Sequence, residues 1–373
     1  MKKTILSWLI FPSLIFSQYE LITFNVIVPD STDHVYLIGN HKNLGNWNHS
    51  KAVKLITVND TLFTTTVRLP KNKTIEFKFT RGSWDKEALD NNLSIPQNHS
   101  ITVGEQDTIN YTIHSWKDWR PFPMNQVKGN LIIYENVYSP QLDNDRTVLV
   151  WLPPSYEIDI NKRYPVLYLH DGQNAFTSGL SLSGEEWKLD ETVTKLIDQQ
   201  KIEEIIMVAL YNGENRTGEY SPKHQGNAYA DFLIQTIKPW IDQTYRTQNE
   251  SEHTAVLGSS MGGIISFHLG WEHSNIFSMV GCLSPAFLVD RNEIINRVKK
   301  SKESPNFKFT IQNGTEELEA ELQPSINKMI KYLKKKGYKE NTDYLYKIYD
   351  RNNHTEKAWA QQVRDTLLFF FGI

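Results

Sequence analysis

The hydrophobic pattern of the chain changes its period near residue 120, and this change constrains the fold more than any other feature. Before that point, short runs rich in β-branched and aromatic residues are separated by turn residues such as Pro29-Asp30 and Pro70-Lys71-Asn72. Regular short strands without a helical period indicate a β-sandwich of about 100 residues. The expected strands cover residues 21–28, 33–38, 62–69, 74–80 and 109–113.

From residue 128 onward, short apolar runs alternate with amphipathic segments. Alternating βα units predict a largely parallel sheet with helices on both faces, here an α/β-hydrolase fold. Two paired strands, 129–134 and 147–151, open this region. Further strands are expected at 165–169, 205–209, 254–257, 279–283, 307–311 and 344–349, and helices at 189–199, 228–244, 262–273, 318–336 and 355–371.

Length and charge exclude several classes of protein. A chain of 373 residues suits two domains rather than one. Its 43 acidic and 40 basic residues nearly balance, so the chain lacks the electrostatic footprint of a protein that binds nucleic acid or an anionic membrane. The single cysteine rules out an internal disulfide and any zinc site built from cysteines.

The N-terminus has the pattern of an export signal. Met1-Lys2-Lys3 is positively charged, and residues 5–16 form an apolar run too short to span a bilayer. Ser17 is a small residue at a plausible cleavage point. We therefore expect a signal peptide over 1–17 and a secreted or periplasmic protein, with a β-sandwich over 18–118, a proline-containing linker over 119–127 and the α/β domain over 128–373.

One motif suggests chemistry. Gly258-Ser259-Ser260-Met261-Gly262 fits G-x-S-x-G, follows an expected strand and opens an expected helix. That context is typical of a nucleophile elbow, in which glycines permit a tight turn and the turn lifts the serine hydroxyl above the sheet edge. The helix N-terminus behind the serine offers N–H groups to a developing oxyanion. Ser260 is therefore the candidate nucleophile.

A serine nucleophile needs a base and an acid, which follow it in the chain order of α/β hydrolases. Of the histidines after Ser260, His268 and His273 lie on the elbow helix, whereas His354 lies in a polar loop after the last strand. His354 is the candidate base. For the acid, Glu317 is preferred because it follows the strand that ends near residue 311. Its rivals are Glu316, Glu319 and Asp350.

Backbone N–H groups of Met261 and Gln173 are the candidate oxyanion donors, the second from the loop His170-Asp171-Gly172-Gln173-Asn174. His170 precedes Ser260 and is interpreted as structural. Because the sequence has no HExxH, Walker A or Rossmann glycine pattern, we expect no metal and no nucleotide or flavin cofactor.

Residues 128–373 resemble the secreted esterases of the α/β-hydrolase superfamily, including feruloyl-esterase-like and enterochelin-esterase-like proteins. The resemblance implies hydrolysis of carboxylic esters through an acyl-serine intermediate. It also implies that the Gly-Thr-x-acid string places the triad acid at Glu317. The matching strings are Leu169-His170-Asp171-Gly172-Gln173-Asn174, Gly258-Ser259-Ser260-Met261-Gly262-Gly263, Leu283-Ser284-Pro285-Ala286-Phe287, Gly314-Thr315-Glu316-Glu317 and His354-Thr355-Glu356-Lys357-Ala358-Trp359.

Residues 19–115 resemble a family 20 starch-binding module, through Leu44-Gly45-Asn46-Trp47-Asn48, Phe77-Lys78-Phe79 and Trp84. The resemblance implies a sugar-stacking site at Trp47, Trp84 and Lys78, with an α-glucan-like polysaccharide as partner. Aromatic faces suit this role because they stack on the apolar faces of sugar rings. The alternative is a sandwich that packs on the enzyme without binding sugar.

Three functions remain open from the sequence. The first is an exported serine esterase that acts on acyl groups carried by carbohydrate. The second is a siderophore esterase that cleaves an enterobactin-like trilactone by the same chemistry. The third is a carbohydrate-binding protein with an inactive hydrolase domain.

Overall fold

The computed structural model describes residues 18–29, 32–91, 95–119, 126–179, 181 and 183–373. It divides the chain into two compact units, Met1–Pro121 and Phe122–Ile373, and each is described here by itself. The expected signal peptide, 1–17, and residues 120–125 of the expected linker lie outside the described residues.

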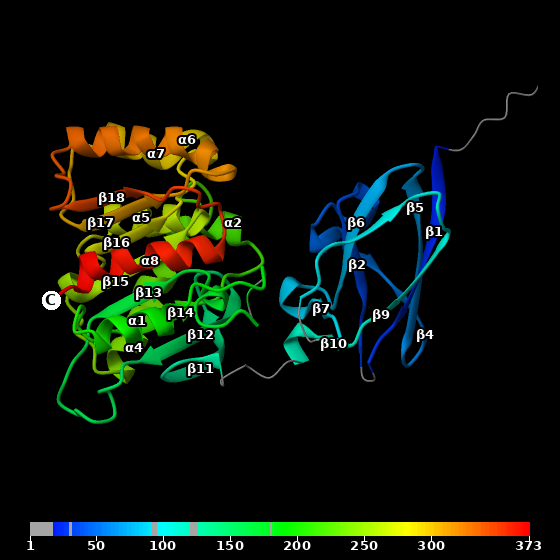
Figure 1. Ribbon diagram of the computed structural model, residues 1–373, viewed down its shortest axis with the longest axis horizontal. Coiled ribbons are helices and arrows are strands. Elements are labelled where there is room, and N and C mark those ends of the chain that lie inside the picture. The colour runs from blue at the N-terminus through cyan, green and yellow to red at the C-terminus, as the bar shows by residue number, and fades with distance from the viewer. Residues whose placement is uncertain (1–17, 30–31, 92–94, 120–125, 180, 182) are drawn as a thin grey trace, which may run out of the picture. The chain divides into compact units, whose positions relative to one another are not determined.

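The first unit contains two four-stranded sheets that face each other across one apolar core (Figure 1). The sheets have the strand orders β4-β5-β1-β9 and β3-β2-β6-β8, and β7 pairs with β10 beside them. Along β1, Ile22, Phe24 and Val26 alternate with more exposed residues and pack against Leu37 and Phe77 of the other sheet. The strands are β1 Tyr19–Ile27, β2 Tyr36–Gly39, β3 Val53–Lys54, β4 Ile56–Asn59, β5 Leu62–Pro70, β6 Thr74–Thr80, β7 Ala88–Leu89, β8 His99–Thr102, β9 Thr108–Thr112 and β10 Ser115–Trp116.

The second unit is built on an eight-stranded sheet of order β11-β12-β14-β13-β15-β16-β17-β18. Antiparallel pairs join β11 to β12 and β12 to β14, and all later pairs are parallel. The central strands β13 to β16 are buried along their whole length, as expected for parallel strands covered on both faces. The strands are β11 Asn130–Ser139, β12 Asn144–Leu152, β13 Val166–Leu169, β14 Ile206–Leu210, β15 Thr254–Ser259, β16 Met279–Leu283, β17 Lys308–Asn313 and β18 Tyr344–Ile348.

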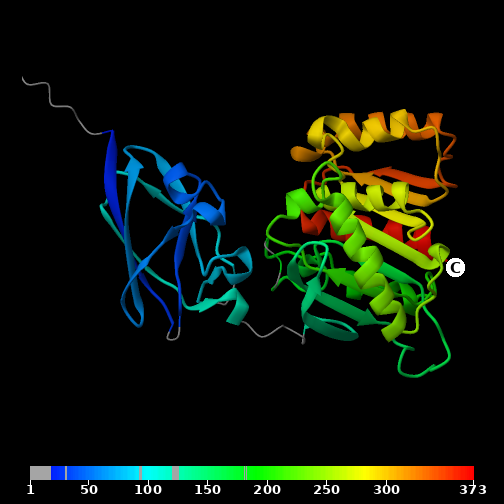
Figure 2. The same cartoon turned by 180° about the vertical axis from the view of Figure 1, so that it is seen from behind.

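Helices cover both faces of this sheet. Helices α1 and α8 contact each other and pack on one face (Figure 1). On the opposite face, α3 to α7 share a second core, and Figure 2 shows the segment 226–244 crossing it. The helices are α1 Leu189–Asp198, α2 Arg216–Glu219, α3 Gly226–Asp231, α4 Lys238–Thr244, α5 Met261–Glu272, α6 Val289–Lys300, α7 Leu318–Lys335 and α8 Glu356–Phe371, with a π-helical stretch at Phe232–Ile237 and 3-10 turns at Lys42–Leu44, His49–Lys51, Trp84–Lys86, Lys117–Trp119, Gly172–Asn174 and Ser251–His253.

The predicted fold class is confirmed: a β-rich unit precedes a unit with a mostly parallel sheet. The five expected helices are present, whereas α2 and α6 were not expected. None of the helices in the described ranges is long and apolar enough to cross a membrane.

Candidate active site

Ser260 stands at the junction of β15 and α5 in a strained backbone conformation. Its φ of 55° and ψ of −117° lie where non-glycine residues are rare, and such strain is characteristic of functional turns. The flanking glycines make this turn possible because side chains would not fit. A Cβ on Gly258 would lie 2.4 Å from the carbonyl oxygen of Gly262, and a Cβ on Gly263 would lie 2.9 Å from Pro285.

The last residue of β16 and the segment after it hold both backbone groups of Ser260. The Ser260 N–H donates to Leu283 O at 2.9 Å, and the Ala286 N–H donates to Ser260 O at 3.1 Å. The Ser260 side chain is half-buried, and its hydroxyl makes no hydrogen bond with another described residue. The backbone is thus fixed while the hydroxyl stays available.

His354 lies in the loop between β18 and α8, at the same edge of the sheet as Ser260. Strands β15 and β18 run parallel, so their carboxyl ends, and the loops that follow, meet at one edge. The His354 Nδ1 atom lies 3.4 Å from Oε1 of Glu319. The Glu319 side chain is fully buried, and that of His354 is 15% exposed.

The carboxylate beside His354 therefore belongs to Glu319 and not to Glu317, the residue preferred from the sequence. Glu317 precedes α7, has an exposed side chain and lines a surface pocket. Glu316 and Asp350, the other rivals, are exposed as well.

The buried stripe of α7 explains why Glu319 points inward. The buried positions of this helix include 319, 322, 326, 329 and 333, which repeat at intervals of three and four residues. Glu319 occupies the first position of this stripe. Leu318, although apolar, is 41% exposed. The periodicity of α7 was visible in the sequence, so it could have distinguished Glu319 from its rivals.

Two further side chains hold this pair, and sequence reasoning assigned no role to either. The buried Ser284 hydroxyl donates to Glu319 Oε1 at 2.6 Å, and Trp359 Nε1–H donates to Ser284 Oγ at 3.0 Å. The Trp359 ring meets the His354 ring edge-on, with centroids 4.9 Å apart. A closed set of contacts thus links His354, Glu319, Ser284 and Trp359. Ser284 directly follows Leu283, whose carbonyl accepts the Ser260 N–H, so this set of contacts is also linked to the turn at Ser260.

The two candidate oxyanion donors are backbone N–H groups that have no partner among the described residues. Met261 is the first residue of α5, where an N–H has no intrahelical acceptor. Gln173 lies in the 3-10 turn Gly172–Asn174 after β13, the central strand beside β15. Both residues are buried.

An ion pair between the buried Asp171 and the partly exposed Arg216 fixes the loop that carries Gln173. Arg216 donates to both carboxylate oxygens of Asp171, at 2.6 and 2.8 Å, and Asn212 Nδ2 donates to the same carboxylate at 2.7 Å. The Arg216 guanidinium keeps the pKa of Asp171 below its usual value, although burial alone would raise it. A Cβ on Gly262 would lie 3.3 Å from this carboxylate, so Asp171 sits against the first turn of α5.

The buried histidines His170 and His268 are placed as structural groups. Burial lowers the pKa of each to about 3, so both are neutral at ordinary pH. His170 Nδ1 lies 2.8 Å from the Tyr229 hydroxyl, and His268 Nε2 lies 3.1 Å from Asn227 Oδ1.

In the first unit, Trp47 and Trp84 lie side by side. Their ring centroids are 6.2 Å apart at an angle of 41°, and His49 packs edge-on against Trp84 at 4.5 Å. Both tryptophans are half-buried, so part of each ring faces solvent. Trp47 has a φ of 62°, and its N–H donates to Gly39 O at 2.9 Å, which fixes the turn. The pair forms a tilted aromatic surface.

Lys78, the third expected sugar contact, binds buried groups of the protein instead. Its ammonium pairs with the buried Glu87 and donates to Pro96 O at 2.9 Å. Burial raises the pKa of Glu87 and outweighs the opposing effect of Lys78. Only 13% of the Lys78 side chain is exposed, so little of it is free to meet a sugar.

No group of three or more acidic, histidine or cysteine side chains in the described ranges is placed to hold a metal ion. The expected absence of metal and cofactor stays a prediction.

Comparison with known families assigns both units. Residues 139–370 match the family described as "Putative esterase", and residues 20–112 match the family described as "Starch binding domain". An amylopullulanase of Thermoanaerobacterium thermosulfurigenes is 32% identical over 122 residues, which are 31% of this chain and 6% of that protein.

Solved structures show the same fold. A ferulic acid esterase superposes with a TM-score of 0.54 at 20% identity and covers 65% of this chain and 98% of its own. The ferric enterobactin esterase of Salmonella typhimurium has a TM-score of 0.55 at 13% identity and covers 95% of this chain and 94% of its own. Residues 20–112 are similar to starch-binding domains, and the match over residues 139–370 spans more than half of the chain, which therefore belongs to the esterase family.

Proposed function

We propose that the protein is an exported serine esterase that removes acyl groups from carbohydrate. The observation that carries this proposal is the buried contact between Glu319 and His354 at the sheet edge where the strained Ser260 stands. A serine, an imidazole and a buried carboxylate together form the machinery of acyl transfer.

In the proposed mechanism, Ser260 Oγ attacks the ester carbonyl while His354 takes its proton. Glu319 stabilises the imidazolium that forms and orients the ring. Neither His354 Nδ1 nor Glu319 Oε2 has a hydrogen-bond partner among the described residues. The distance of 3.4 Å between Nδ1 and Oε1 shortens as His354 becomes charged, because catalytic hydrogen bonds tighten in the reacting complex.

The oxyanion of the tetrahedral intermediate is held by the N–H groups of Met261 and Gln173. Protonated His354 then gives its proton to the departing alcohol, which leaves an acyl group on Ser260. Water, activated by His354, releases the acid and restores the serine. Ser284 and Trp359 do not touch the substrate in this scheme and act as positioning residues for Glu319 and His354.

The starch-binding domain supports carbohydrate as the carrier of the ester. Trp47 and Trp84 offer the stacking surface, and tethering the enzyme to a glucan raises the local concentration of esters on that polymer. Lys78 is not part of this proposal because Glu87 holds its ammonium. Export is proposed from the pattern of residues 1–17.

A fluorophosphonate probe and an ester panel test the function. The probe should label the wild-type protein at Ser260 and leave a Ser260→Ala protein unlabelled. Acetyl and feruloyl esters of oligosaccharides should be cleaved faster than a catechol trilactone. A Ser260→Ala protein with wild-type activity on 4-nitrophenyl acetate would refute the serine mechanism.

A second candidate, a siderophore trilactone esterase, is favoured by the likeness to ferric enterobactin esterase over 95% of this chain. Preferential cleavage of the trilactone in the same panel would support it. Failure of the probe to label the protein, with glucan binding intact, would instead indicate the third alternative, a carbohydrate-binding protein with an inactive hydrolase domain.

A further inference from the structure

One carboxylate has no part in the acyl transfer described above, yet it joins the two loops that this reaction needs. Glu356 is the first residue of α8 and follows His354 by two positions. Its Oε1 accepts a hydrogen bond from Asn174 Nδ2 at 3.2 Å, and its Oε2 accepts one from the Ser183 hydroxyl at 2.8 Å. Asn174 and Ser183 lie 182 and 173 positions earlier in the chain, so only the fold brings these groups together.

Asn174 ends the turn that carries the second candidate oxyanion donor. The 3-10 turn Gly172–Asn174 places Asn174 directly after Gln173, and both residues are buried. The backbone of Asn174 is held on both sides, because its N–H donates to Asp171 O at 2.9 Å and its carbonyl accepts the Trp187 N–H at 2.8 Å. The turn is therefore short and stiff, and a displacement of the Asn174 side chain would also displace Gln173.

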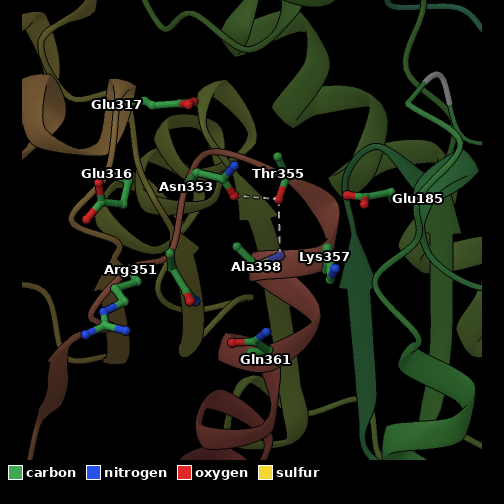
Figure 3. A pocket seen from close by; sticks show the side chains of 10 residues that line it. Glu185, Glu316, Glu317, Arg351, Asn353, Thr355, Lys357, Ala358 and Gln361 are labelled. Atoms are coloured by element: carbon green, nitrogen blue, oxygen red, sulfur yellow. Dashed lines mark hydrogen bonds between the residues drawn. The ribbon is translucent and has the colours of Figure 1, made fainter.

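The first turn of α8, at the other end of this link, carries the contacts of the base. Thr355 caps the helix, since its hydroxyl accepts the Ala358 N–H at 3.3 Å and donates to Asn353 Oδ1 at 3.0 Å (Figure 3). The Trp359 N–H donates to Thr355 O at 3.0 Å, and the Trp359 ring packs against His354. His354 lies directly before the cap, so it moves with this turn.

The Glu356 carboxylate also belongs to the electrostatic surroundings of the oxyanion loop. Burial raises the pKa of Glu356, the Ser183 hydrogen bond lowers it, and the Asp171 carboxylate raises it further. Burial disfavours the charge of Arg216, but the carboxylates of Asp171 and Glu356 raise the pKa of that guanidinium. Arg216 holds the start of the turn through Asp171. Glu356 holds its end through Asn174.

We propose that Glu356 is a positioning residue that couples the loop of the general base to the loop of the second oxyanion donor. The link consists of two hydrogen bonds to a carboxylate, which are about twice as strong as bonds between neutral groups. Acyl transfer needs the imidazole and the Gln173 N–H in register, because the oxyanion forms at its donors while the base holds the proton. This inference rests on the proposed function and deepens it. Glu356 does not touch the substrate.

Two substitutions at Glu356 separate the hydrogen bonds from the charge. Glu356→Leu removes both bonds and should lower kcat for 4-nitrophenyl acetate about 10- to 30-fold, with KM within about twofold, since alignment matters most in the transition state. Glu356→Gln keeps an acceptor for Asn174 and a donor for the Ser183 oxygen, so its kcat should fall only about threefold. Gln361→Leu, an exposed position on the same helix, is the matched control and should keep wild-type kinetics.

A reversed pair tests the link itself. Asn174→Asp places a second carboxylate against Glu356 and should lower kcat at least about tenfold, because like charges repel. The double variant Asn174→Asp/Glu356→Gln again sets a donor against an acceptor, in the opposite sense, and should recover most of that loss. Two groups that act separately would instead show the product of the two single effects.

Inhibition by phenylboronic acid distinguishes positioning from a loss of folded protein. The Ser260 oxygen adds to the trigonal boron, its proton passes to His354, and a boron-bound oxygen takes the place of the oxyanion. The inhibition constant should therefore rise about tenfold in Glu356→Leu, in step with kcat. A merely structural role would lower the fraction of protein that a fluorophosphonate labels, and would leave the inhibition constant and kcat per labelled site unchanged.

Two results would overturn this inference and leave the serine mechanism standing. One is a wild-type kcat per labelled site in Glu356→Leu. The other is a reversed pair that is no more active than the product of its single variants. A wild-type protein that neither cleaves the ester nor reacts with the fluorophosphonate would overturn the proposed function, and this inference with it.

Discussion

The candidate site in each unit is held in a different way. At the esterase site, the buried Glu319 and Trp359 contact His354, Ser284 holds both of them by hydrogen bonds, and backbone hydrogen bonds fix Ser260. At the aromatic site, Trp47 and Trp84 sit on short turns with part of each ring in solvent.

The difference reflects what each site must do. Acyl transfer requires groups held within tenths of an ångström, so buried side chains position Glu319 and backbone hydrogen bonds fix Ser260. Stacking on a sugar requires a surface of the right shape and tolerates small displacements. The two sites should therefore respond differently to mutation. At the esterase site, mutations should cause large losses of activity that depend on one another. At the aromatic site, each mutation should cause a small loss of binding.

The largest effect should come from the two neighbouring glutamates. Glu319→Gln should lower kcat for 4-nitrophenyl acetate by about 10³- to 10⁴-fold, because the amide cannot stabilise the imidazolium. Glu317→Gln should stay near wild type, because its side chain is exposed and does not contact His354. A loss at Glu317 as large as at Glu319 would contradict the assignment of the acid from the geometry.

A smaller loss is expected from Ser284→Ala. Its hydrogen bond to the Glu319 carboxylate is charge-assisted, so its removal should cost about 10- to 100-fold in kcat. A less stabilised carboxylate attracts the imidazolium more strongly, so the acid limb of the kcat/KM profile should move to higher pH.

The pH profile is the discriminating readout for Ser284, because a purely structural loss would lower activity without moving that limb. Ser278→Ala offers a comparison: this serine donates to Ser251 O, away from His354.

At the aromatic site, Trp84→Ala should weaken retention on an α-glucan by about tenfold, the loss of one stacking surface. Hydrolysis of 4-nitrophenyl acetate should not change, since that substrate carries no glycan. Trp119→Ala, which removes another partly exposed tryptophan of the first unit, is the matched control. Retention that survives in Trp84→Ala would exclude Trp84 as a sugar contact, and a wild-type protein that is not retained would favour the non-binding interpretation of this domain.

A change in stability, rather than in activity, is expected at the start of the esterase unit. Burial raises the pKa of Asp190 to about 8, and the Lys128 N–H donates to its Oδ2 at 2.6 Å. A pKa raised above its unfolded value means that the folded state keeps a proton the unfolded state loses, so stability falls as pH rises from about 4 to about 8.

Asp190→Asn should remove the decline in stability that the Asp190 carboxyl causes, which is about 1.4 kcal/mol for each unit of pKa shift. The measurement is the unfolding midpoint against pH, with Asp198→Asn, exposed on the same helix, as control. Parallel curves for wild type and Asp190→Asn would show that Asp190 does not carry this linkage.

The elements with a strong local pattern were predictable from the sequence. The buried strands and the amphipathic helices appear where their periods placed them, because those periods follow from the geometry of a single element. Helix α6 was missed for a local reason. Its first turn contains Asp290, Arg291 and Asn292 at positive φ, and its few apolar residues lie close together further on.

The choice among the acidic residues could not follow from chain order alone. Glu316, Glu317 and Glu319 all follow β17 within a few residues, so each satisfies the expected sequence position. The apolar period of α7 marks Glu319 as the residue on the buried face, but the fold decides that this face meets His354. Similarly, the run Phe77-Lys78-Phe79 gave no sign that Glu87 would hold the Lys78 ammonium.

The sequence by itself determined the two-part architecture, the strand–serine–helix turn and the loop that carries His354, because each depends on residues close together in the chain. Tertiary structure alone decided that the buried face of α7 brings Glu319 to His354, and that Ser284 and Trp359 hold them. These contacts join elements tens of residues apart, and their geometry depends on how helices and loops pack against a finished sheet.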